Sequence, residues 1–458
     1  MSEPGRSPPE HVREPPSHDG HPIIGNTYQL VRQQGGLFEE AAANGDIVRL
    51  RLLGFGNLYQ VNHPDIVEEI LTDRDRFVKA SQSREDLGDL LGQGLVLSEG
   101  ELWERQRQRI QPAFYMEQIA DYTESMVSAV EQAADEWTGE PVVNVEDEMK
   151  ALTLRILVTS IFGGEIDYEG QQIRETVEKL QEPGQPAKQP IARMVPRWVP
   201  IPMWRRYKEG IREMESVIET FVEARRGEAA QHDDLLSRLL TSTDEDGDGM
   251  SEKLLRDELM TFLFAGHETT ATALTFTWYL LSQHPEVEQK LHAEVDAVLD
   301  GGPATFEDLP ELEYTEQVIQ ESMRLYPPVP QIPRETTEPV ELGGYAVPEG
   351  VTIAPSQWTI HRDGRFWEQP AQFRPERFAT ERDRPRFAYF PFGGGPRRCI
   401  GQQFAMVEAK LILASLAHQY RLRLQSDPEI DLAVSITTMP IDPIEMQVEP
   451  RHGKKSDR

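Results

Sequence analysis

The stretch at residues 390–401, FPFGGGPRRCIG, constrains this chain more than any other part of the sequence. It contains Cys399, the only cysteine among 458 residues. Consecutive glycines before it let the backbone turn sharply, and a helical pattern of apolar residues begins after Gly401. A sulfur between such a loop and a helix lies near free backbone N–H groups and the positive end of the helix dipole, and both favour the thiolate. A thiolate held in this way can serve as a nucleophile, a redox sensor or an axial metal ligand.

The fixed spacing of Phe392, Gly395, Arg397, Cys399 and Gly401 resembles the haem-binding signature of the cytochrome P450 superfamily. A match at so many fixed positions is rare by chance, which weighs against the buried, inert residue that a lone cysteine usually is. The resemblance implies that Cys399 ligates the iron of haem b as a thiolate and that Phe392 shields the sulfur. It also implies that Arg397 binds a haem propionate and that Gly401 contributes to binding the cofactor.

A second motif interrupts the apolar stretch 259–281, which is predicted to form the long buried helix of a large domain. Glycine inside a helix costs about 1 kcal/mol relative to alanine, so the small residues Ala265 and Gly266 are expected to leave room for a flat group. Glu268 and Thr269 add an acid and a hydroxyl to this helix, although the hydroxyl could simply bond to the carbonyl four residues earlier. The resemblance implies instead that Glu268 and Thr269 relay protons to the oxygen under activation, with Ala265 against the haem.

Trp103 and Arg107 lie four residues apart on a predicted helix and therefore share one face, which could hold a carboxylate. In the resembled family such a pair binds a haem propionate, and Arg334 and His361 match two further positions that often do so. Taken alone, this pair is a weak signal, because a surface arginine on a helix is common.

A small basic patch is predicted from Arg105 and Arg109, on the other side of the same helix, together with Arg398. We hypothesise that an acidic electron donor docks on this patch of an otherwise acidic protein. A merely solvated surface is the alternative interpretation.

Glu321 and Arg324 have the spacing of a surface ion pair, which is worth under about 1 kcal/mol. They are followed by the sequence LYPP and later by Arg377 within the sequence PERF, as in the resembled family. The resemblance implies a buried network of Glu321, Arg324 and Arg377 that fixes the cysteine loop. Its role would be structural.

The chain is strongly acidic, with a formal net charge of −31 and a pI of about 4.8. This charge disfavours nucleic acid as a partner, because phosphates require a basic surface. It also opposes compaction in ordinary buffer, whereas molar salt shortens the Debye length to roughly 3 Å and screens the repulsion. We therefore hypothesise a salt-rich cytoplasm, as in a halophilic microbe; a merely acidic protein is the alternative.

The sequence predicts a flexible polar arm at residues 1–22, one haem domain at 23–449 and a disordered polar tail at 450–458. The arm lacks the apolar core of a signal peptide. The apolar stretch 259–281 contains Glu268, and a carboxylate at a bilayer centre costs roughly 2.5–3.5 kcal/mol, so no membrane span is predicted. A single cysteine forms no internal disulfide, which fits a reducing compartment such as the cytoplasm.

Apolar periodicity predicts several secondary-structure elements. Helices are expected at 28–43, 64–78 and 311–326 and within 117–180, hairpins at 47–61 and 340–353, and an irregular glycine-rich loop at 81–99. The segment 183–204 resembles the mobile cover of the substrate entrance in the same family, with a plain connecting loop as the alternative.

These features predict a mainly α protein with small β regions and the cytochrome P450 fold, a triangular prism with haem between the central helix and the cysteine loop. The expected function is a haem-thiolate monooxygenase. It would insert one oxygen atom from O2 into an apolar small molecule, using two electrons from an external donor such as a ferredoxin with its reductase. A haem-thiolate peroxygenase or isomerase, a haem-based sensor and a thiol redox enzyme are the alternatives. The acid–threonine pair favours the monooxygenase.

Overall fold

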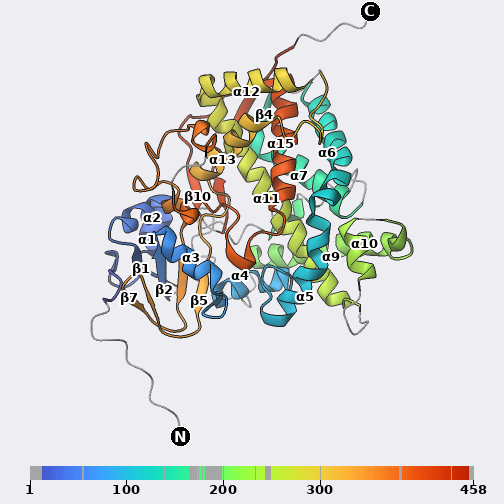
Figure 1. Cartoon of the computed structure of the whole chain (residues 1–458). Coiled ribbons are helices and arrows are strands. Elements are labelled where there is room, and N and C mark those ends of the chain that lie inside the picture. The colour runs from blue at the N-terminus through green and yellow to red at the C-terminus, as the bar shows by residue number, and fades with distance from the viewer. Residues whose placement is uncertain are drawn as a thin grey trace, which may run out of the picture. The chain divides into compact units, whose positions relative to one another are not determined.

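The computed structural model describes residues 13–53, 56–138, 141–163, 173, 175–177, 179–180, 199, 201–232, 234–242, 249–299, 301–380, 384–434 and 436–452. Its helices and strands are labelled in Figure 1. The chain forms two compact units, and each is described by itself. The first unit comprises residues 1–87, 329–371 and 383–399, and the second comprises residues 88–328, 372–382 and 400–458.

The first unit is built on a five-stranded sheet with the strand order β1-β2-β8-β5-β3. β1 and β2 form an antiparallel hairpin that pairs Ile47 with Val61, which confirms the hairpin predicted from alternating apolar residues. β8 pairs parallel to β2 and antiparallel to β5, while β6 and β7 form a separate hairpin. The strands are β1 Ile47–Leu52, β2 Gly56–Val61, β3 Phe77–Lys79, β5 Arg334–Thr336, β6 Val340–Leu342, β7 Tyr345–Val347 and β8 Thr352–Pro355.

The core of this unit lies between the sheet and α3, whose apolar residues face inward at helical spacing. His63 caps α3 by accepting a hydrogen bond from the Asp65 N–H, and proline occupies the first helical position, where its missing N–H does no harm. The helices of this unit are α1 Thr27–Gln33, α2 Gly35–Ala42, α3 Pro64–Thr72 and α14 Gln357–Ile360. A further helix, α4 Ser81–Leu91, continues from this unit into the second.

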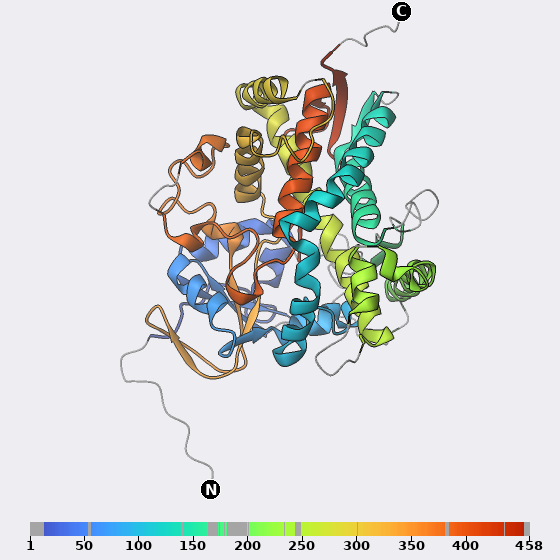
Figure 2. The same ribbon diagram turned by 45° about the vertical axis from the view of Figure 1, so that its right-hand side comes forward.

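The second unit is helical, and its longest element is α11, with 32 residues. Ser251 caps α11 by accepting a hydrogen bond from the Leu254 N–H at 3.3 Å. α11 packs against α7, α9, α13 and α15, so most of its side chains are buried. Figures 1 and 2 both show α15, in red, running beside α6, in cyan. The helices are α5 Gly100–Ile110, α6 Met116–Trp137, α7 Val145–Ile161, α9 Pro202–Arg226, α10 Leu235–Thr241, α11 Glu252–Gln283, α12 Pro285–Val298, α13 Glu313–Leu325 and α15 Gln402–Gln419.

Two small sheets complete the second unit. One has the order β4-β12-β9, with β12 antiparallel to both neighbours, and the other pairs β10 with β11. Their strands are β4 Val142–Asn144, β9 Tyr420–Leu424, β10 Leu432–Val434, β11 Thr438–Pro440 and β12 Glu445–Pro450. Across both units, none of the described helices combines the length and apolarity needed to cross a membrane.

Several predicted elements have different bounds in the structure. The helix expected at 28–43 is two helices, because Gln34 adopts a φ of 49° between them. The helix expected at 64–78 ends earlier, since Asp73 turns the chain by accepting from the Arg76 N–H, and β3 follows. The loop expected at 81–99 begins with α4, which Leu90 and Leu91 anchor by burial. The last strand expected in the 340–353 hairpin instead joins the main sheet as β8.

The described residues near the two termini make defined contacts. In the predicted arm, Arg13 O accepts from the Ala346 N–H at 2.8 Å, and Pro16 O accepts from the Arg49 N–H at 2.8 Å. In the predicted tail, the Arg451 N–H donates to Gln419 O at 2.8 Å. Residues 1–12 and 453–458 lie outside the described residues, as does most of the predicted entrance cover at 183–204.

Candidate active site

The cysteine loop of the first unit presents Cys399 as an exposed thiol. The backbone N–H of Cys399 donates to Phe392 O at 2.9 Å, which closes the loop on itself. Gly393 and Gly395 have φ angles of 69° and 64°, a region that residues with side chains rarely adopt. A Cβ at Gly395 would lie 2.0 Å from Leu71 O, at the end of α3. The glycines therefore let the loop lie directly on the α3 backbone, and this close contact restricts where the sulfur can be.

His361 supports the beginning of this loop. It is fully buried, and its Nε2 accepts a hydrogen bond from the Phe390 N–H at 3.1 Å. Its ring also packs against Tyr389 and Phe390, with centroid distances of 5.2 and 5.3 Å. The structure thus shows a loop-supporting contact for His361, and its role as a propionate ligand stays a prediction.

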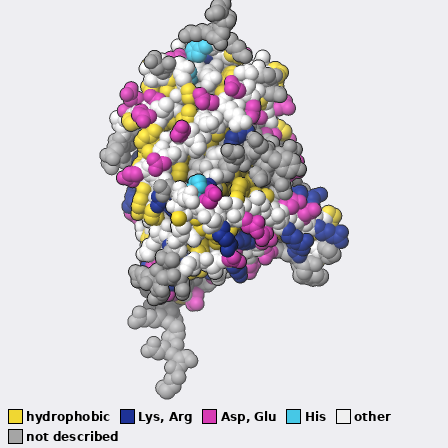
Figure 3. Space-filling model, turned by 90° about the vertical axis from the view of Figure 1, so that its right-hand side faces the viewer, with side chains coloured by type: hydrophobic (Ala, Val, Ile, Leu, Met, Phe, Trp, Pro, Cys, Tyr) yellow, Lys and Arg dark blue, Asp and Glu magenta, His cyan; other side chains and the backbone are white. Residues whose placement is uncertain are grey.

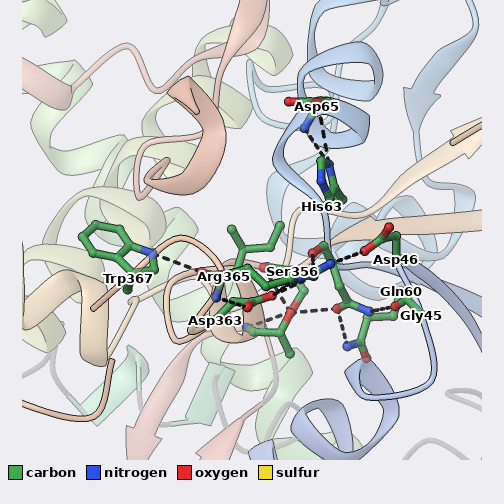
Figure 4. A network of polar contacts seen from close by, with 12 residues as sticks. Gly45, Asp46, Gln60, His63, Asp65, Ser356, Asp363, Arg365 and Trp367 are labelled. Carbon is green, nitrogen blue, oxygen red and sulfur yellow. Dashed lines mark hydrogen bonds and ion pairs between the residues drawn. The ribbon is translucent and has the colours of Figure 1, made fainter. Parts of the chain in front are cut away.

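A polar network around Arg365 fixes the segment that follows α14 (Figure 4). Arg365 Nη1 lies 2.7 Å from Asp46 Oδ1, and Nη2 lies 2.7 Å from Asp363 Oδ2. Nη2 also donates to Asn62 O at 2.9 Å. The hydrogen bond with Asp363 is the main cause that raises the pKa of Arg365, so the guanidinium stays charged. This network ties the segment to the residue before β1 and the residue after β2 in the same unit.

Phe392, Arg397 and Arg334 are the other predicted haem contacts in the first unit. Phe392 and Arg397 are both partly buried within the cysteine loop, and Arg397 ends a short 3-10 turn. Arg334 begins β5, is 5% exposed and donates through Nη1 to Pro333 O at 3.0 Å. This unit therefore carries a thiol and two of the predicted propionate-binding arginines, whose contacts with propionates stay predictions.

In the second unit, α11 carries a buried acid next to a partly open face. Glu268 is 2% exposed, and its Oε1 accepts a hydrogen bond from Thr437 Oγ1 at 3.0 Å. Thr269 Oγ1 donates to Ala265 O at 3.0 Å. This is the hydrogen bond to the carbonyl four residues earlier that the sequence analysis named as an alternative role for the hydroxyl. Ala265 and Thr269 share one face and are partly exposed, whereas most side chains of α11 are buried. A hydroxyl on this face can still accept a proton or a hydrogen bond from a ligand.

Close packing of two helices gives a reason for glycine at position 266 other than the predicted space for a flat group. A Cβ there would lie 2.9 Å from Leu157 Cδ1, so the glycine lets α7 pack closely on α11. Thr153 of α7 donates to His267 O at 3.0 Å at the same place. His267 Nδ1 lies 2.6 Å from Leu263 O, and burial lowers the pKa of this ring to about 4. A neutral, buried His267 thus belongs to the packing of the two helices.

The predicted face of α5 is present in the structure. The Arg107 guanidinium carbon lies 5.7 Å from the centroid of the buried Trp103 ring, a cation–π contact. Arg105 is exposed and lies 3.8 Å from Glu101 Oε2, while Arg109 is partly exposed. The two arginines therefore have different surroundings, as predicted: Arg107 lies beside the Trp103 indole, and Arg105 faces solvent.

The predicted Glu321 network is confirmed within the second unit. Glu321 Oε2 lies 2.7 Å from Arg324 Nε, and Oε1 lies 2.9 Å from Arg377 Nε. The three side chains are at most 1% exposed. Both guanidinium groups also donate to Gln372 O, and the Arg374 N–H donates to Glu321 Oε1. Burial is the largest effect on Arg377 and lowers its pKa. That this network fixes the cysteine loop stays a prediction.

Sequence reasoning missed two residues that surround Glu268. One is Thr437, which donates to its carboxylate as described above. The other is Lys150 of α7, whose Nζ lies 2.6 Å from Glu146 Oε1. Burial lowers the pKa of Lys150, but the Glu146 carboxylate and the charge of the nearby Glu268 outweigh it, so the net pKa is raised. Only tertiary structure brings these segments together, so no local sequence pattern could have revealed the contacts.

Sequence reasoning also missed Glu408 on α15, the helix that Gly401 caps at its N terminus. Glu408 is 1% exposed, and its described hydrogen-bond partner is the Thr270 hydroxyl of α11. Burial raises the pKa of Glu408 to about 8. A signal was present in the sequence, because this acid lies among apolar residues of a helix that is apolar on most sides. A Cβ at Gly401 itself would lie 3.7 Å from Phe114, so the second unit does not require glycine there.

Replacing Glu408 by glutamine is expected to stabilise the protein at neutral and alkaline pH. Between about pH 4.5 and 8 the unfolded chain has released this proton while the folded chain keeps it, so wild-type stability falls as pH rises. At pH 7 the variant should gain up to about 3 kcal/mol, and the gain should vanish near pH 4.5. Urea unfolding at several pH values measures this difference. A difference between variant and wild type that does not change with pH would contradict it.

Comparisons with known proteins agree with this geometry. The family model described as "Cytochrome P450" matches residues 15–448. The chain is 36% identical over 405 residues to cyclooctat-9-en-7-ol 5-monooxygenase of Streptomyces melanosporofaciens, covering 88% of each chain. It is 32% identical to pentalenene oxygenase of Streptomyces avermitilis, covering 89% of this chain and 91% of the relative. Among solved structures, the cytochrome P450DA heme domain superposes with a TM-score of 0.87 at 28% identity, covering 96% of this chain and 98% of that one.

Each unit, taken by itself, carries residues that suit the prosthetic group that this family binds. The first unit offers an exposed thiol in a tight glycine loop, a donor that suits iron. Arg334 and Arg397 of the same unit are of a type that suits the carboxylates of haem b, as is Arg107 in the second unit. The partly exposed face of Ala265 and Thr269 leaves α11 open to a ligand. With the family match over nearly its whole length, the chain belongs to the cytochrome P450 family and is a haem-thiolate monooxygenase that binds haem b.

Proposed function

We propose that this enzyme oxidises an apolar cyclic substrate of the terpenoid class. We also propose that Cys399 is the iron ligand of the enzyme and that Glu268 and Thr269 deliver protons. Two relatives, pentalenene oxygenase and cyclooctat-9-en-7-ol 5-monooxygenase, are named for activity on a cyclic alkene and a cyclic alkenol. The observation that carries the proposal is the pair formed by the buried Glu268 and the partly exposed Thr269 on α11. A monooxygenase that uses O2 needs such a proton path, whereas a peroxygenase does not.

The cysteine loop and the arginines would bind the cofactor. Cys399 would ligate the iron as a thiolate, with Phe392 beside the sulfur and Gly401 at the start of α15. Arg107, Arg334 and Arg397 suit the propionates, with Trp103 and His361 as the other predicted contacts. Haem b supplies the activation of O2 when it is bound, and the thiolate favours O–O cleavage. The chain's residues must then hold substrate, exclude water and supply protons.

Glu268 and Thr269 would move the protons. Glu268 Oε1 accepts from Thr437 Oγ1, which holds the carboxylate in one orientation next to the open face. Thr269 Oγ1 donates to Ala265 O, so its lone pairs remain able to accept a proton from Glu268 through water. Lys150 interacts electrostatically with Glu268, and its raised pKa keeps it protonated, so it would act as a fixed positive charge near the relay rather than as a proton donor.

A ligand screen tests the proposed substrate class. Cyclic terpene hydrocarbons and their alcohols would be compared with straight-chain fatty acids of similar carbon number. We expect the cyclic compounds to shift the haem spin state and to yield products with one added oxygen atom when O2 and reductase are supplied. A spin shift with the fatty acids alone would contradict the terpenoid proposal and leave the monooxygenase assignment intact.

We also propose that an acidic protein such as a ferredoxin delivers electrons at α5. The exposed Arg105 and the partly exposed Arg109 lie four residues apart and share one side of this helix. Reversing both to glutamate should slow reduction by an acidic donor, and the effect should shrink at high salt. The haem spectrum should stay unchanged. Reversing Arg205 and Arg226 of α9, which are likewise exposed, is the control. Equal reduction rates in both double variants would refute the docking site.

The proposal of a salt-rich cytoplasm rests on the charge of −31. Acidic side chains, in magenta, are spread over much of the face drawn in Figure 3. Repulsion among them should fall as the Debye length shortens from about 30 Å at 0.01 M to about 3 Å at 1 M salt. The melting temperature should therefore rise steeply with potassium chloride. Sucrose is the control, because it stabilises proteins without screening charge. Equal melting temperatures at low and molar salt would end this proposal.

A further inference from the structure

A cluster of one carboxylate and two imidazoles lies in the second unit. It consists of Asp296 on α12, His418 in the last turn of α15 and His452 just after β12, and we name it the Asp296 cluster. One ligand atom from each residue lies within 4.8 Å of the other two. We propose that the Asp296 cluster binds a divalent transition-metal ion of the zinc class. His418 lies about 24 Å along α15 from Gln402, so this ion would take no part in the haem chemistry.

The distances suit a tetrahedral site with a small adjustment. His418 Nδ1 lies 3.3 Å from Asp296 Oδ1, and His452 Nε2 lies 3.8 Å from the same oxygen. Ligand atoms bonded to Zn2+ at about 2.0–2.1 Å in a tetrahedron are about 3.3 Å apart. His452 must therefore move closer to the other two ligands, and its side chain is 57% exposed. Two imidazoles and a carboxylate leave the fourth position to water, and this donor set suits Zn2+, Ni2+ or Cu2+.

Two buried ring nitrogens in this region lack hydrogen-bond partners among the described residues. His418 Nδ1 is one, although it lies 3.3 Å from Asp296 Oδ1 and is close enough for an electrostatic contact with that carboxylate. His292 Nε2 is the other. His292 lies one turn before Asp296 on α12, and both line a surface hollow with Arg421 and Arg451. Buried polar atoms are rarely left without partners, and a bound ion with its water is one reason for such an exception.

Arg451 contacts the same carboxylate and would orient it for the metal. Its Nη2 lies 2.7 Å from Asp296 Oδ2, whereas the two histidines contact the other carboxylate oxygen, Oδ1. Its Nη1 donates to Asp296 Oδ1 at 3.0 Å, and also to Ala417 O at 2.8 Å and His418 O at 3.0 Å. Nη1 can release Oδ1 to the metal and keep the two carbonyl acceptors, while Nη2 holds Oδ2 as an outer-shell partner. The positive charge of Arg451 lowers the affinity, so we expect moderate rather than tight binding.

A metal at this position would join three segments that are far apart in the chain. It would connect α12, the C-terminal end of α15 and the residues that follow β12. Because the folded protein brings these ligands together and the unfolded chain does not, binding should stabilise the second unit.

The test uses full-length protein with haem bound, so that the cysteine thiolate does not compete for metal. After chelator treatment, Zn2+ is titrated by calorimetry, and melting is followed with and without Zn2+. We expect one ion per chain and a rise in melting temperature. His452→Ala should weaken binding about tenfold or more and remove the rise. The substituted residue is exposed, so this variant should still fold.

The control is His232→Ala, because His232 Nε2 lies 3.9 Å from Glu228 Oε2 in a similarly exposed pair outside any such cluster. This variant should bind Zn2+ as wild type does. Absence of stoichiometric binding by wild type, or equal binding by the His452→Ala variant, would overturn the proposal. Equal loss in both variants would overturn it as well, because it would indicate non-specific binding to exposed imidazoles.

Discussion

Replacing Cys399 by serine is expected to abolish the red-shifted carbon-monoxide band of thiolate-ligated haem and to reduce monooxygenase turnover to background. A serine hydroxyl stays protonated at neutral pH and cannot supply the charge that a thiolate gives to iron. The loop itself should persist, because its closing bond runs from the backbone N–H of residue 399 to Phe392 O. Difference spectra of the reduced protein with carbon monoxide measure the band.

The control for this substitution is Ile400→Val at the neighbouring position. This change removes one methylene group and leaves the sulfur in place, so the band and the turnover should be retained. Circular dichroism establishes that both variants are folded. A Cys399→Ser protein that keeps the thiolate band would refute the assignment of the iron ligand, since the chain has no second cysteine.

Replacing Glu321 by glutamine is expected to destabilise the protein by about 3–5 kcal/mol. The substitution leaves Arg324 and Arg377 buried without the carboxylate that lies 2.7 and 2.9 Å from their Nε atoms. Folded proteins typically have only about 5–15 kcal/mol of stability, so the variant should be marginal and should bind haem poorly. Urea unfolding gives the free energy, and the haem content of purified protein gives the second readout.

The control for Glu321 is another glutamate–arginine pair with a similar contact distance, whose two side chains are both exposed to solvent. Glu252 Oε1 lies 3.0 Å from Arg226 Nη2, with side chains 83% and 57% exposed. Glu252→Gln should cost less than about 1 kcal/mol, because solvent screens the pair. Similar losses for the two variants would show that burial of the Glu321 network contributes nothing, contrary to the expectation.

Local sequence reasoning succeeded where short-range chemistry is decisive. The alternating side chains predicted the hairpin of β1 and β2. The glycines before Cys399 predicted a sharply turning backbone, and two of them do have positive φ angles. It failed where packing is decisive. Gly266 was interpreted as space for a ligand, whereas the structure shows Leu157 of α7 at that position. The residues 81–91 are a helix because Leu90 and Leu91 are buried, which their glycine-rich surroundings did not indicate.

The sequence by itself indicated the reaction class of this protein, because its cysteine loop and its acid–threonine pair resemble the motifs of the cytochrome P450 family, to which the chain belongs. It also determined the acidic character that a salt titration can test. Only the tertiary structure showed that Thr437 and Lys150 surround Glu268, that Glu408 is buried beside Thr270, and that two histidines meet Asp296. These contacts join segments more than a hundred residues apart, and their energies depend on burial and distance, which no short stretch of sequence specifies.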